Sequence, residues 1–170
     1  MKNIVLIGMP GTGKSVVGQV LADYFQYRFV DLDDLIADMA KMSLPDILRT
    51  QGLDAFLEIE REVGMSVSMN DTIIATGGSM VLSDDAMQNL RKNSLVVWLE
   101  TPLSKISDRM PDDLIDRGIA APAGMTIREI YLHRQPLYAQ YADLIVVSQD
   151  DPENTAQQVV AMMRTVGAVL

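Results

Sequence analysis

Cysteine is absent from this chain of 170 residues, and histidine occurs once, at His133. The protein can therefore form neither a disulfide bond nor a thiolate metal site, and one histidine cannot make a histidine metal cluster. No apolar stretch approaches the roughly 20 residues that a membrane-spanning helix needs. Residues 1–3 lead directly into the first predicted strand and leave no room for a signal peptide, so we expect a cytoplasmic protein.

Basic charge is also scarce in this sequence. The 14 Lys and Arg residues are outnumbered by 23 Asp and Glu residues, which gives a formal net charge of -9. Binding to nucleic acid or to an anionic membrane normally needs a basic surface, so we expect neither partner. Binding of ATP stays open, because phosphate recognition is local and Mg²⁺ supplies positive charge.

Short apolar runs that are typical of strands recur along the chain, at residues 4–7, 28–30, 72–75, 95–99 and 144–147. Helix-like stretches separate them, and this alternation predicts an α/β fold with a parallel sheet flanked by helices. The first, fourth and fifth runs are nearly all apolar, which predicts a sheet covered on both faces. With 48% hydrophobic residues, the length suits a single domain over 1–170, which we expect to be a monomer.

Two segments interrupt the simple alternation. Residues 33–70 look helical throughout, as separate helices over 33–40, 45–51 and 53–69, and this is too much for one crossover. We therefore expect a helical insertion there. Residues 110–125 are irregular and contain two prolines and two glycines, as a mobile lid would, although an ordinary surface loop remains the alternative.

The most informative motif lies at residues 8–15, which read Gly-Met-Pro-Gly-Thr-Gly-Lys-Ser and match the phosphate-binding P-loop pattern. An apolar strand precedes it and a helical pattern over 14–25 follows, which is the context that the motif requires. The glycines let backbone N–H groups converge on a polyphosphate at the positive end of the helix. Lys14 would reach the β- and γ-phosphates of ATP, and the Ser15 hydroxyl would take one Mg²⁺ position.

Acidic residues follow the second predicted strand, where residues 31–34 read Asp-Leu-Asp-Asp. Alternation along an extended backbone would send Asp31 and Asp33 to one side, at the sheet edge where ligands of open α/β sheets bind. One carboxylate could hold Mg²⁺ and another could accept a proton from an attacking hydroxyl. Capping of the next helix is the alternative, which we favour for Asp34 and disfavour for Asp33.

Two further groups of residues are suited to phosphoryl transfer. Gly77 and Gly78 follow the third strand and allow a ligand to approach the backbone closely, with a tight turn as the alternative. Arg109, Arg117 and Arg134 lie in or beside the predicted lid, where guanidinium groups can stabilise the charge of a transferred phosphoryl group. A lone arginine is usually a solvated surface residue, so each is weak evidence when taken singly.

Together these motifs resemble the shikimate kinase family of small P-loop kinases over nearly the whole chain. The likeness rests on the P-loop, on the Asp-x-Asp at residues 31–33, on residues 52–60 and on Gly77-Gly78. It continues through the Arg117 segment to the string Arg-Gln-Pro-Leu-Tyr at residues 134–138, which is distinctive. The resemblance implies a five-stranded P-loop NTPase-type sheet, a substrate-binding insertion, a lid, and the use of ATP and Mg²⁺.

The resemblance also implies roles for individual residues. It places nucleotide contacts at Gly11, Thr12, Gly13, Lys14, Ser15 and Val16, an adenine-side wall at Arg109 and Pro152, and metal ligands at Ser15 and Asp31. It makes Asp33 the residue that binds and deprotonates the substrate hydroxyl, Gly77 and Gly78 its backbone contacts, Arg134 the binder of its carboxylate, and Arg117 the lid arginine at the γ-phosphate. The implied reaction converts shikimate to shikimate 3-phosphate, a step in aromatic amino acid biosynthesis.

Four positions depart from the family pattern. The insertion of the family usually carries a second carboxylate-binding arginine, and here that position is Leu57. Leu53 replaces a glutamate, Ser79 replaces the third glycine of a triplet, and Gly118-Ile119 replaces Pro-Leu after the lid arginine. Arg61 lies one helical turn beyond Leu57 and is a candidate replacement for the missing arginine.

These departures leave more than one function open. The leading hypothesis is a kinase that transfers the γ-phosphoryl group of MgATP to a hydroxyl of a small acid, with shikimate as the default acceptor. A rival is a related kinase for another hydroxy acid, a sugar acid or an amino-acid alcohol such as homoserine. A nucleotide-binding regulatory module without transferase activity is a further alternative. A nucleoside monophosphate kinase would need cations for a second phosphate, and the insertion offers only Lys41, Arg49 and Arg61.

Overall fold

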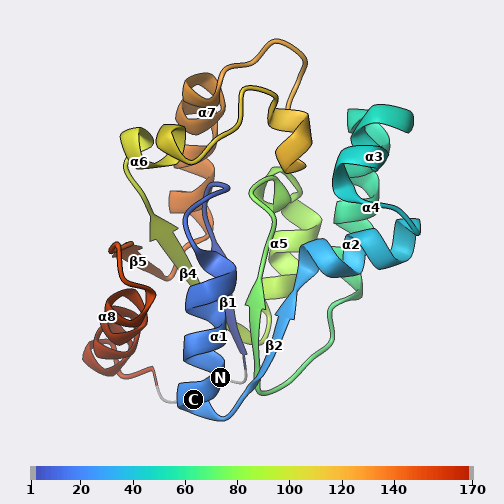
Figure 1. The fold of residues 1–170 in the computed structure, drawn as a ribbon. Helices are drawn as coiled ribbons and strands as arrows, with labels where there is room; N and C mark the ends of the chain where they lie inside the picture. Colours follow the sequence, from blue (N-terminus) through green and yellow to red (C-terminus); the bar gives the residue numbers. More distant parts are fainter. Residues whose placement is uncertain (1–2, 169–170) are drawn as a thin grey trace.

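A five-stranded parallel sheet forms the centre of the computed structural model, which describes residues 3–168 (Figure 1). The strands are β1 (Asn3–Ile7), β2 (Arg28–Asp31), β3 (Thr72–Ala75), β4 (Ser94–Glu100) and β5 (Leu144–Val147), in the spatial order β2-β3-β1-β4-β5. The central strand pairs on both sides, Val5 opposite Ile74 and opposite Val96. The predicted fold class is confirmed, and each predicted strand is present with ends that differ by one residue at most.

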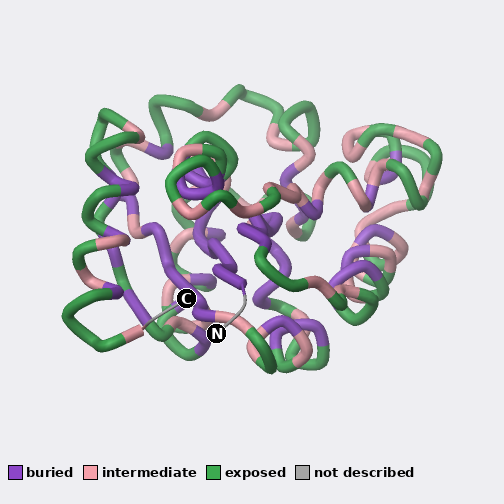
Figure 2. The backbone as a smooth tube through the Cα atoms, turned by 90° about the horizontal axis from the view of Figure 1, so that it is seen from below, coloured by how far each residue is buried: buried purple, intermediate pink, exposed green. Residues whose placement is uncertain are grey.

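Helices cover both faces of this sheet. They are α1 (Lys14–Phe25), α2 (Leu32–Ala40), α3 (Leu44–Thr50), α4 (Leu53–Ser66), α5 (Asp84–Arg91), α6 (Leu103–Asp108), α7 (Ile127–Tyr141) and α8 (Pro152–Thr165), with short 3₁₀ turns η1 (Met80–Leu82) and η2 (Leu114–Arg117). Helices α1 and α8 pack on one face, where Leu6, Leu21 and Val159 share a core. The other face carries a larger core that includes Val5 and Met87. In Figure 2 the buried backbone runs through the middle of the molecule, between these two layers.

The fifth strand departs from the prediction of cover on both faces. Its side chains alternate between buried and exposed, and Ile145 and Val147 are 44% and 49% exposed. The strand lies at the edge of the sheet, where α8 covers only the face that Leu144 and Val146 occupy. An apolar run was therefore insufficient to predict two covered faces, because composition does not show which strand lies at an edge.

The helical insertion between β2 and β3 is present as α2, α3 and α4. Helix α4 ends at Ser66 rather than at residue 69 as predicted. The side-chain amide of Asn89 donates to the carbonyl groups of Gly64, Met65 and Val67 over 3.0 to 3.1 Å, and so satisfies acceptors at the end of the helix. This contact comes from another helix, so the local pattern could not reveal it.

The predicted lid segment runs from α6 to α7 across the end of the molecule to which the strands point (Figure 1). It is irregular apart from η2, and it touches the insertion. Arg49 of α3 forms an ion pair with Asp116 of η2, and a Cβ atom added to Gly118 would lie 3.0 Å from the Cβ of Leu44. Its position over the sheet is what a lid needs, while its movement stays a prediction. Within residues 3–168, no helix combines the length and apolar character required to cross a membrane.

Candidate active site

The P-loop joins β1 to α1 and encloses the Lys14 ammonium group. Gly13 has a φ of 86°, a left-handed conformation that glycine adopts without strain, and α1 begins at the next residue. The Nζ atom of Lys14 donates to the carbonyl oxygens of Gly8 and Met9, each over 2.8 Å. Burial lowers the pKa of Lys14 to about 8, although Asp33 and Asp31 oppose this shift. The ammonium group is therefore held in place before any phosphate binds.

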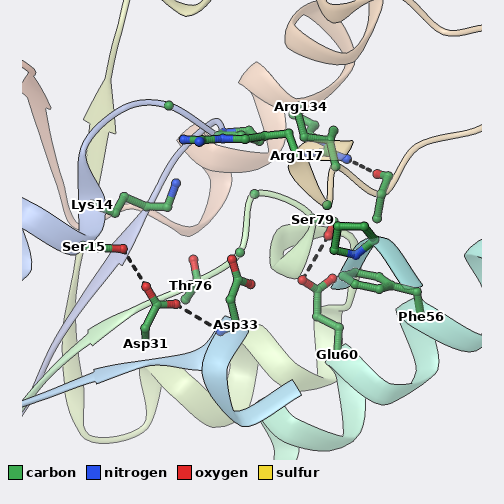
Figure 3. Close-up of a pocket in the computed structure, with 18 of the residues that line it drawn as sticks. Lys14, Ser15, Asp31, Asp33, Phe56, Glu60, Thr76, Ser79, Arg117 and Arg134 are labelled. Carbon is green, nitrogen blue, oxygen red and sulfur yellow. Dashed lines mark hydrogen bonds between the residues drawn. The ribbon is translucent and has the colours of Figure 1, made fainter. Parts of the chain in front are cut away.

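A hydrogen-bonded chain connects the start of α1 to the end of β2. The Ser15 hydroxyl donates to Oδ2 of Asp31 over 2.6 Å, and Oδ1 of Asp31 accepts from the backbone N–H of Asp33 over 3.0 Å (Figure 3). Asp31 is thus the cap of α2, and the expectation that Asp34 caps this helix was wrong. Asp33 lies in the first helical turn rather than on an extended strand, so the alternation argument was also wrong. Both carboxyl groups nevertheless line one cavity.

The Ser15 and Asp31 oxygens fit the requirements of a magnesium site that is completed by substrate. Mg²⁺ is commonly held by one or two protein oxygens together with water and substrate phosphates. Among the described residues there is no group of three or more His, Cys, Asp or Glu side chains that could hold a metal ion by themselves. The Ser15 hydroxyl and the Asp31 carboxylate lie 2.6 Å apart beside the P-loop. They match a site that water and substrate phosphates complete, and not a site formed by protein side chains alone.

A cavity of about 500 Å³ lies at the carboxyl ends of β1, β2 and β3. Figure 3 shows Lys14, Asp33 and Glu60, which come from different helices, directed toward the same space below Arg117 and Arg134. The wall consists of P-loop residues, the ends of β2 and β3, parts of α3 and α4, and the lid: Pro10, Gly11, Gly13, Lys14, Ser15, Val16, Asp31, Asp33, Pro45, Phe56, Glu60, Thr76, Gly77, Gly78, Ser79, Asp116, Arg117, Gly118, Ile119, Ala120 and Arg134. A ligand in this cavity would meet both the P-loop and the insertion.

Asp33 has the properties of a general base in this cavity. The pKa of its carboxyl group is raised to about 6, chiefly by burial and also by the nearby Asp31, while Lys14 opposes the change. A catalytic base works best when its pKa lies near the working pH, where it is ionised yet still takes up a proton readily. Asp33 is therefore suited to accept the proton of a hydroxyl group that is bound beside it.

Glycine is required at positions 77 and 78 because side chains from other elements approach the backbone closely there. A Cβ atom on Gly77 would lie 2.7 Å from Oδ1 of Asp33 and 2.8 Å from Oε2 of Glu60. A Cβ atom on Gly78 would lie 2.7 Å from Pro10 and 3.1 Å from Nη1 of Arg134. A larger residue at either position would require the neighbouring groups to move. With glycine at both positions, two carboxyl groups and one guanidinium group lie close to a short length of backbone.

Arg134 is buried on α7 and is fixed by its surroundings. Its Nη2 atom donates to the carbonyl group of Ala120 in the lid segment, and the Tyr138 hydroxyl, one turn further along α7, donates to the carbonyl of Gly78 over 2.7 Å. The side chain is only 3% exposed. A buried guanidinium group that faces a cavity is well placed to bind an anionic group of a ligand.

Sequence reasoning missed Glu60, which is the most deeply buried acid in the cavity. It is 2% exposed, and its Oε2 atom accepts a hydrogen bond of 3.0 Å from the Ser79 hydroxyl. The pKa of this carboxyl group is raised to about 7, chiefly by burial; the Ser79 hydrogen bond and Arg134 oppose the rise, and Asp33 adds to it. The signal in the sequence was its spacing of four residues from Phe56, because both residues lie on the buried face of α4.

Three predicted nucleotide contacts are absent from the cavity wall. The Thr12 hydroxyl instead lies 3.5 Å from Nζ of Lys14, and Nη1 of Arg109 donates to the carbonyl of Gly11 over 2.6 Å. Pro152 is the first residue of α8. Arg109 thus lies against the P-loop, and the adenine-side wall stays a prediction.

The positions that depart from the family pattern lie around α4. Leu57 is outside the cavity wall and lines an adjacent apolar hollow with Leu53, Leu82 and Met125. Arg61 forms ion pairs on the protein surface instead of facing the cavity. Its Nη2 atom pairs with Asp85 over 2.7 Å and its Nη1 atom with Glu58 over 3.2 Å. Arg61 therefore does not replace the missing arginine. Arg49 is likewise paired, with Asp116, which leaves little for a second nucleotide phosphate.

Comparison with known proteins agrees with this geometry. The family model described as shikimate kinase matches residues 10–164. A shikimate kinase of Synechococcus sp. (strain RCC307) is 35% identical over 98% of this chain and 88% of its own length, and one of Sulfurihydrogenibium sp. (strain YO3AOP1) is 30% identical over 96% and 99%. The mouse protein Threonine synthase-like 1 is 32% identical over 96% of this chain, which corresponds to 22% of that protein.

A solved structure shows that the fold is shared as well. The shikimate kinase of Acinetobacter baumannii, determined in complex with shikimate, superimposes with a TM-score of 0.85 over 98% of this chain and 94% of its own, at 24% identity. The family match covers most of the chain, and the two shikimate kinases described above match over 88% and 99% of their own length. This chain belongs to the shikimate kinase family.

Proposed function

We propose that this protein transfers the γ-phosphoryl group of MgATP to a hydroxyl group of a small carboxylic acid, with shikimate as the acceptor that the names of its relatives indicate. Members of the shikimate kinase family are phosphotransferases that act on an alcohol group and use ATP with Mg²⁺. The observation that carries the proposal is that Lys14, Asp33 and Arg134 face one cavity of about 500 Å³. These groups suit a phosphate, a hydroxyl and a carboxylate, respectively.

The nucleotide side of the proposal rests on the P-loop. Residues 11–16 would hold the phosphates through backbone N–H groups and through Lys14, with Arg109 and Pro152 on the adenine side. Ser15 and Asp31 would hold Mg²⁺, which neutralises charge on the β- and γ-phosphates when it is bound. Arg117 in the lid lines the same cavity and would bind the γ-phosphoryl oxygens.

The acceptor side rests on Asp33 and Arg134. Arg134 would bind the acceptor carboxylate, and Gly77 and Gly78 would let the acceptor lie directly against the backbone between them. Asp33 would orient the reacting hydroxyl and take its proton as the oxygen bonds to the γ-phosphorus. The bond from that phosphorus to the bridging oxygen breaks at the same time, and ADP leaves. The protein contributes position and electrostatic stabilisation.

The wider organisation is part of the same proposal. Residues 1–170 would act as one cytoplasmic, monomeric domain, with the insertion at 33–70 binding the acceptor and the segment at 110–125 closing over it. The Arg49–Asp116 ion pair, which joins the two segments, supports this arrangement. Gel filtration with light scattering would test the monomer, and a stable dimer at assay concentration would contradict it.

The test is ADP release with MgATP and shikimate, with the product identified by mass spectrometry. Saturable turnover and a product heavier than shikimate by one phosphoryl group would support the proposal, and removal of Mg²⁺ with EDTA should stop the reaction. Tight ATP binding without any phosphorylated product, across shikimate and a panel of hydroxy acids, would contradict transferase activity and favour a regulatory nucleotide-binding module.

A further inference from the structure

Glu60 is a buried carboxyl group with spare hydrogen-bonding capacity. Its Oε2 atom accepts the Ser79 hydroxyl over 3.0 Å, whereas Oε1 accepts no hydrogen bond from the described residues. The residue lines the cavity and is 2% exposed. No fully buried side-chain oxygen or nitrogen of the described residues lacks a hydrogen-bond partner, so Oε1 opens to the cavity, where a ligand is placed to supply a hydrogen-bond donor or a cation.

The protein itself offers Glu60 no ion-pair partner. None of the five ion pairs found within residues 3–168 includes this residue. One turn earlier on α4, at the spacing from which a side chain could pair with it, the chain has Leu57. Leu57 and Glu60 line the same second hollow, so an arginine at position 57 would lie near the carboxylate. With leucine there, the negative charge is left for a ligand.

The groups around Gly77 and Gly78 form a three-point pattern. Asp33 and Glu60 approach the Cβ position of Gly77 to 2.7 and 2.8 Å, and Arg134 approaches that of Gly78 to 3.1 Å. A molecule lying on these glycines meets a base for a hydroxyl group, a carboxylate and a guanidinium group. The complementary ligand carries a hydroxyl, an ammonium and a carboxylate, which is the chemistry of an amino acid with a hydroxyl at the end of its side chain.

We propose that this site also phosphorylates α-amino acids with a terminal hydroxyl group, and that Glu60 binds their ammonium group while Arg134 binds their carboxylate. The inference rests on the proposed phosphotransferase function, because it uses the same MgATP and the same Asp33. The acceptor oxygen bonds to the γ-phosphorus, the bond to the bridging oxygen of ATP breaks, ADP leaves, and the hydroxyl proton passes to Asp33. Mass and charge balance without any further reactant.

Two acceptors that differ only in the amino group provide the sharpest test. L-Homoserine carries the ammonium group, and 4-hydroxybutyrate has the same carbon chain without it. With MgATP in the same coupled assay, kcat/KM should be at least about tenfold higher for homoserine, which corresponds to one charge-assisted hydrogen bond. Shikimate is run in parallel as the reference acceptor for the proposed function.

Substitutions in α4 test whether Glu60 causes the preference for homoserine over 4-hydroxybutyrate. Glu60→Gln should reduce the ratio of the two kcat/KM values about tenfold, because the amide keeps the Ser79 contact and loses the charge. Glu58→Gln, which removes an exposed carboxylate from the same helix, should leave the ratio unchanged. Leu57→Arg should reduce the ratio as well and raise kcat/KM for shikimate, and Leu57 is only partly buried, against the edge of the core. Thermal unfolding of each variant checks that it is folded.

The outcomes separate the two proposals. Turnover of shikimate with equal values for homoserine and 4-hydroxybutyrate would overturn the ammonium site and leave the kinase proposal intact. An unchanged ratio in both Glu60→Gln and Leu57→Arg would overturn the role of Glu60. Failure of all three acceptors to be phosphorylated would overturn the proposed function, and the inference would fall with it.

Discussion

Replacement of Glu60 by glutamine should change how the stability of the free protein depends on pH. Burial raises the pKa of Glu60 from 4.5 to about 7 in the folded chain. Between these values the folded protein keeps a proton that the unfolded chain has lost, so the stability of the wild type falls as pH rises. At about 1.4 kcal/mol per unit of pKa, the loss amounts to about 3 kcal/mol once the pH exceeds 7. Glutamine does not titrate, so the Glu60→Gln variant should escape this loss.

The assay is urea unfolding followed by circular dichroism, for both proteins, at several pH values from 4 to 9. The difference in unfolding free energy between variant and wild type should increase by about 3 kcal/mol from pH 4 to pH 8 and then stay level. With a slope of about 2 kcal/mol per molar urea, this moves the midpoint of the variant by about 1.5 M relative to wild type. Glu58→Gln, which removes an exposed carboxylate from the same helix, serves as the control.

A difference that is independent of pH would refute the reasoning. It would mean that Glu60 is ionised in the folded protein at no cost, and therefore that some group already compensates its charge. The free protein would then hold less uncompensated charge at Glu60 for a ligand, and the assays of turnover would decide the ammonium site. A difference with the opposite sign would mean that the folded state stabilises the charged form.

Further substitutions test the proposed roles in catalysis. Lys14→Ala should abolish turnover, because it removes the buried ammonium group of the P-loop, and a near-normal rate in the ADP-release assay would contradict the phosphate assignment. Asp33→Asn should lower kcat about 100- to 10,000-fold while the ATP Kd from calorimetry changes little, since the base is lost and the P-loop is kept. Arg134→Ala should raise the acceptor KM about 10- to 100-fold, the effect of one lost charge-assisted contact, and an unchanged KM would point to an acceptor without a carboxylate. In the wild type, kcat/KM should fall as pH drops below about 6, because Asp33, whose pKa burial raises to about 6, becomes protonated there, and a pH profile that is flat down to pH 5 would exclude it as the base.

Features that depend on neighbouring residues in the chain could be predicted from the sequence. The P-loop needs a strand, glycines that adopt left-handed conformations and a helix start, and all of these occur within residues 3–25. Apolar periodicity likewise predicted the strands to within one residue. Helix ends that depend on a distant side chain could not be predicted, as the contact of Asn89 with the end of α4 illustrates.

The sequence predicted which residues belong to the candidate site better than it predicted how they are arranged. Asp31 and Asp33 were expected on one side of a strand, yet Asp31 caps α2 and Asp33 lies in its first turn, and only the backbone path brings both to the cavity. Arg61 was a candidate for the acceptor site, but Asp85, 24 residues away, directs it elsewhere.

The sequence by itself determined the family, the P-loop and the succession of strands and helices along the chain. Local hydrogen bonding and apolar periodicity are encoded within short stretches of chain. Tertiary structure alone decided the state of Glu60. The pKa of a carboxyl group is set by the loss of water and by the charges around it, and here those come from Ser79, Asp33 and Arg134 on separate elements. Folding brings these groups together at Gly77 and Gly78, where we propose that the acceptor is selected.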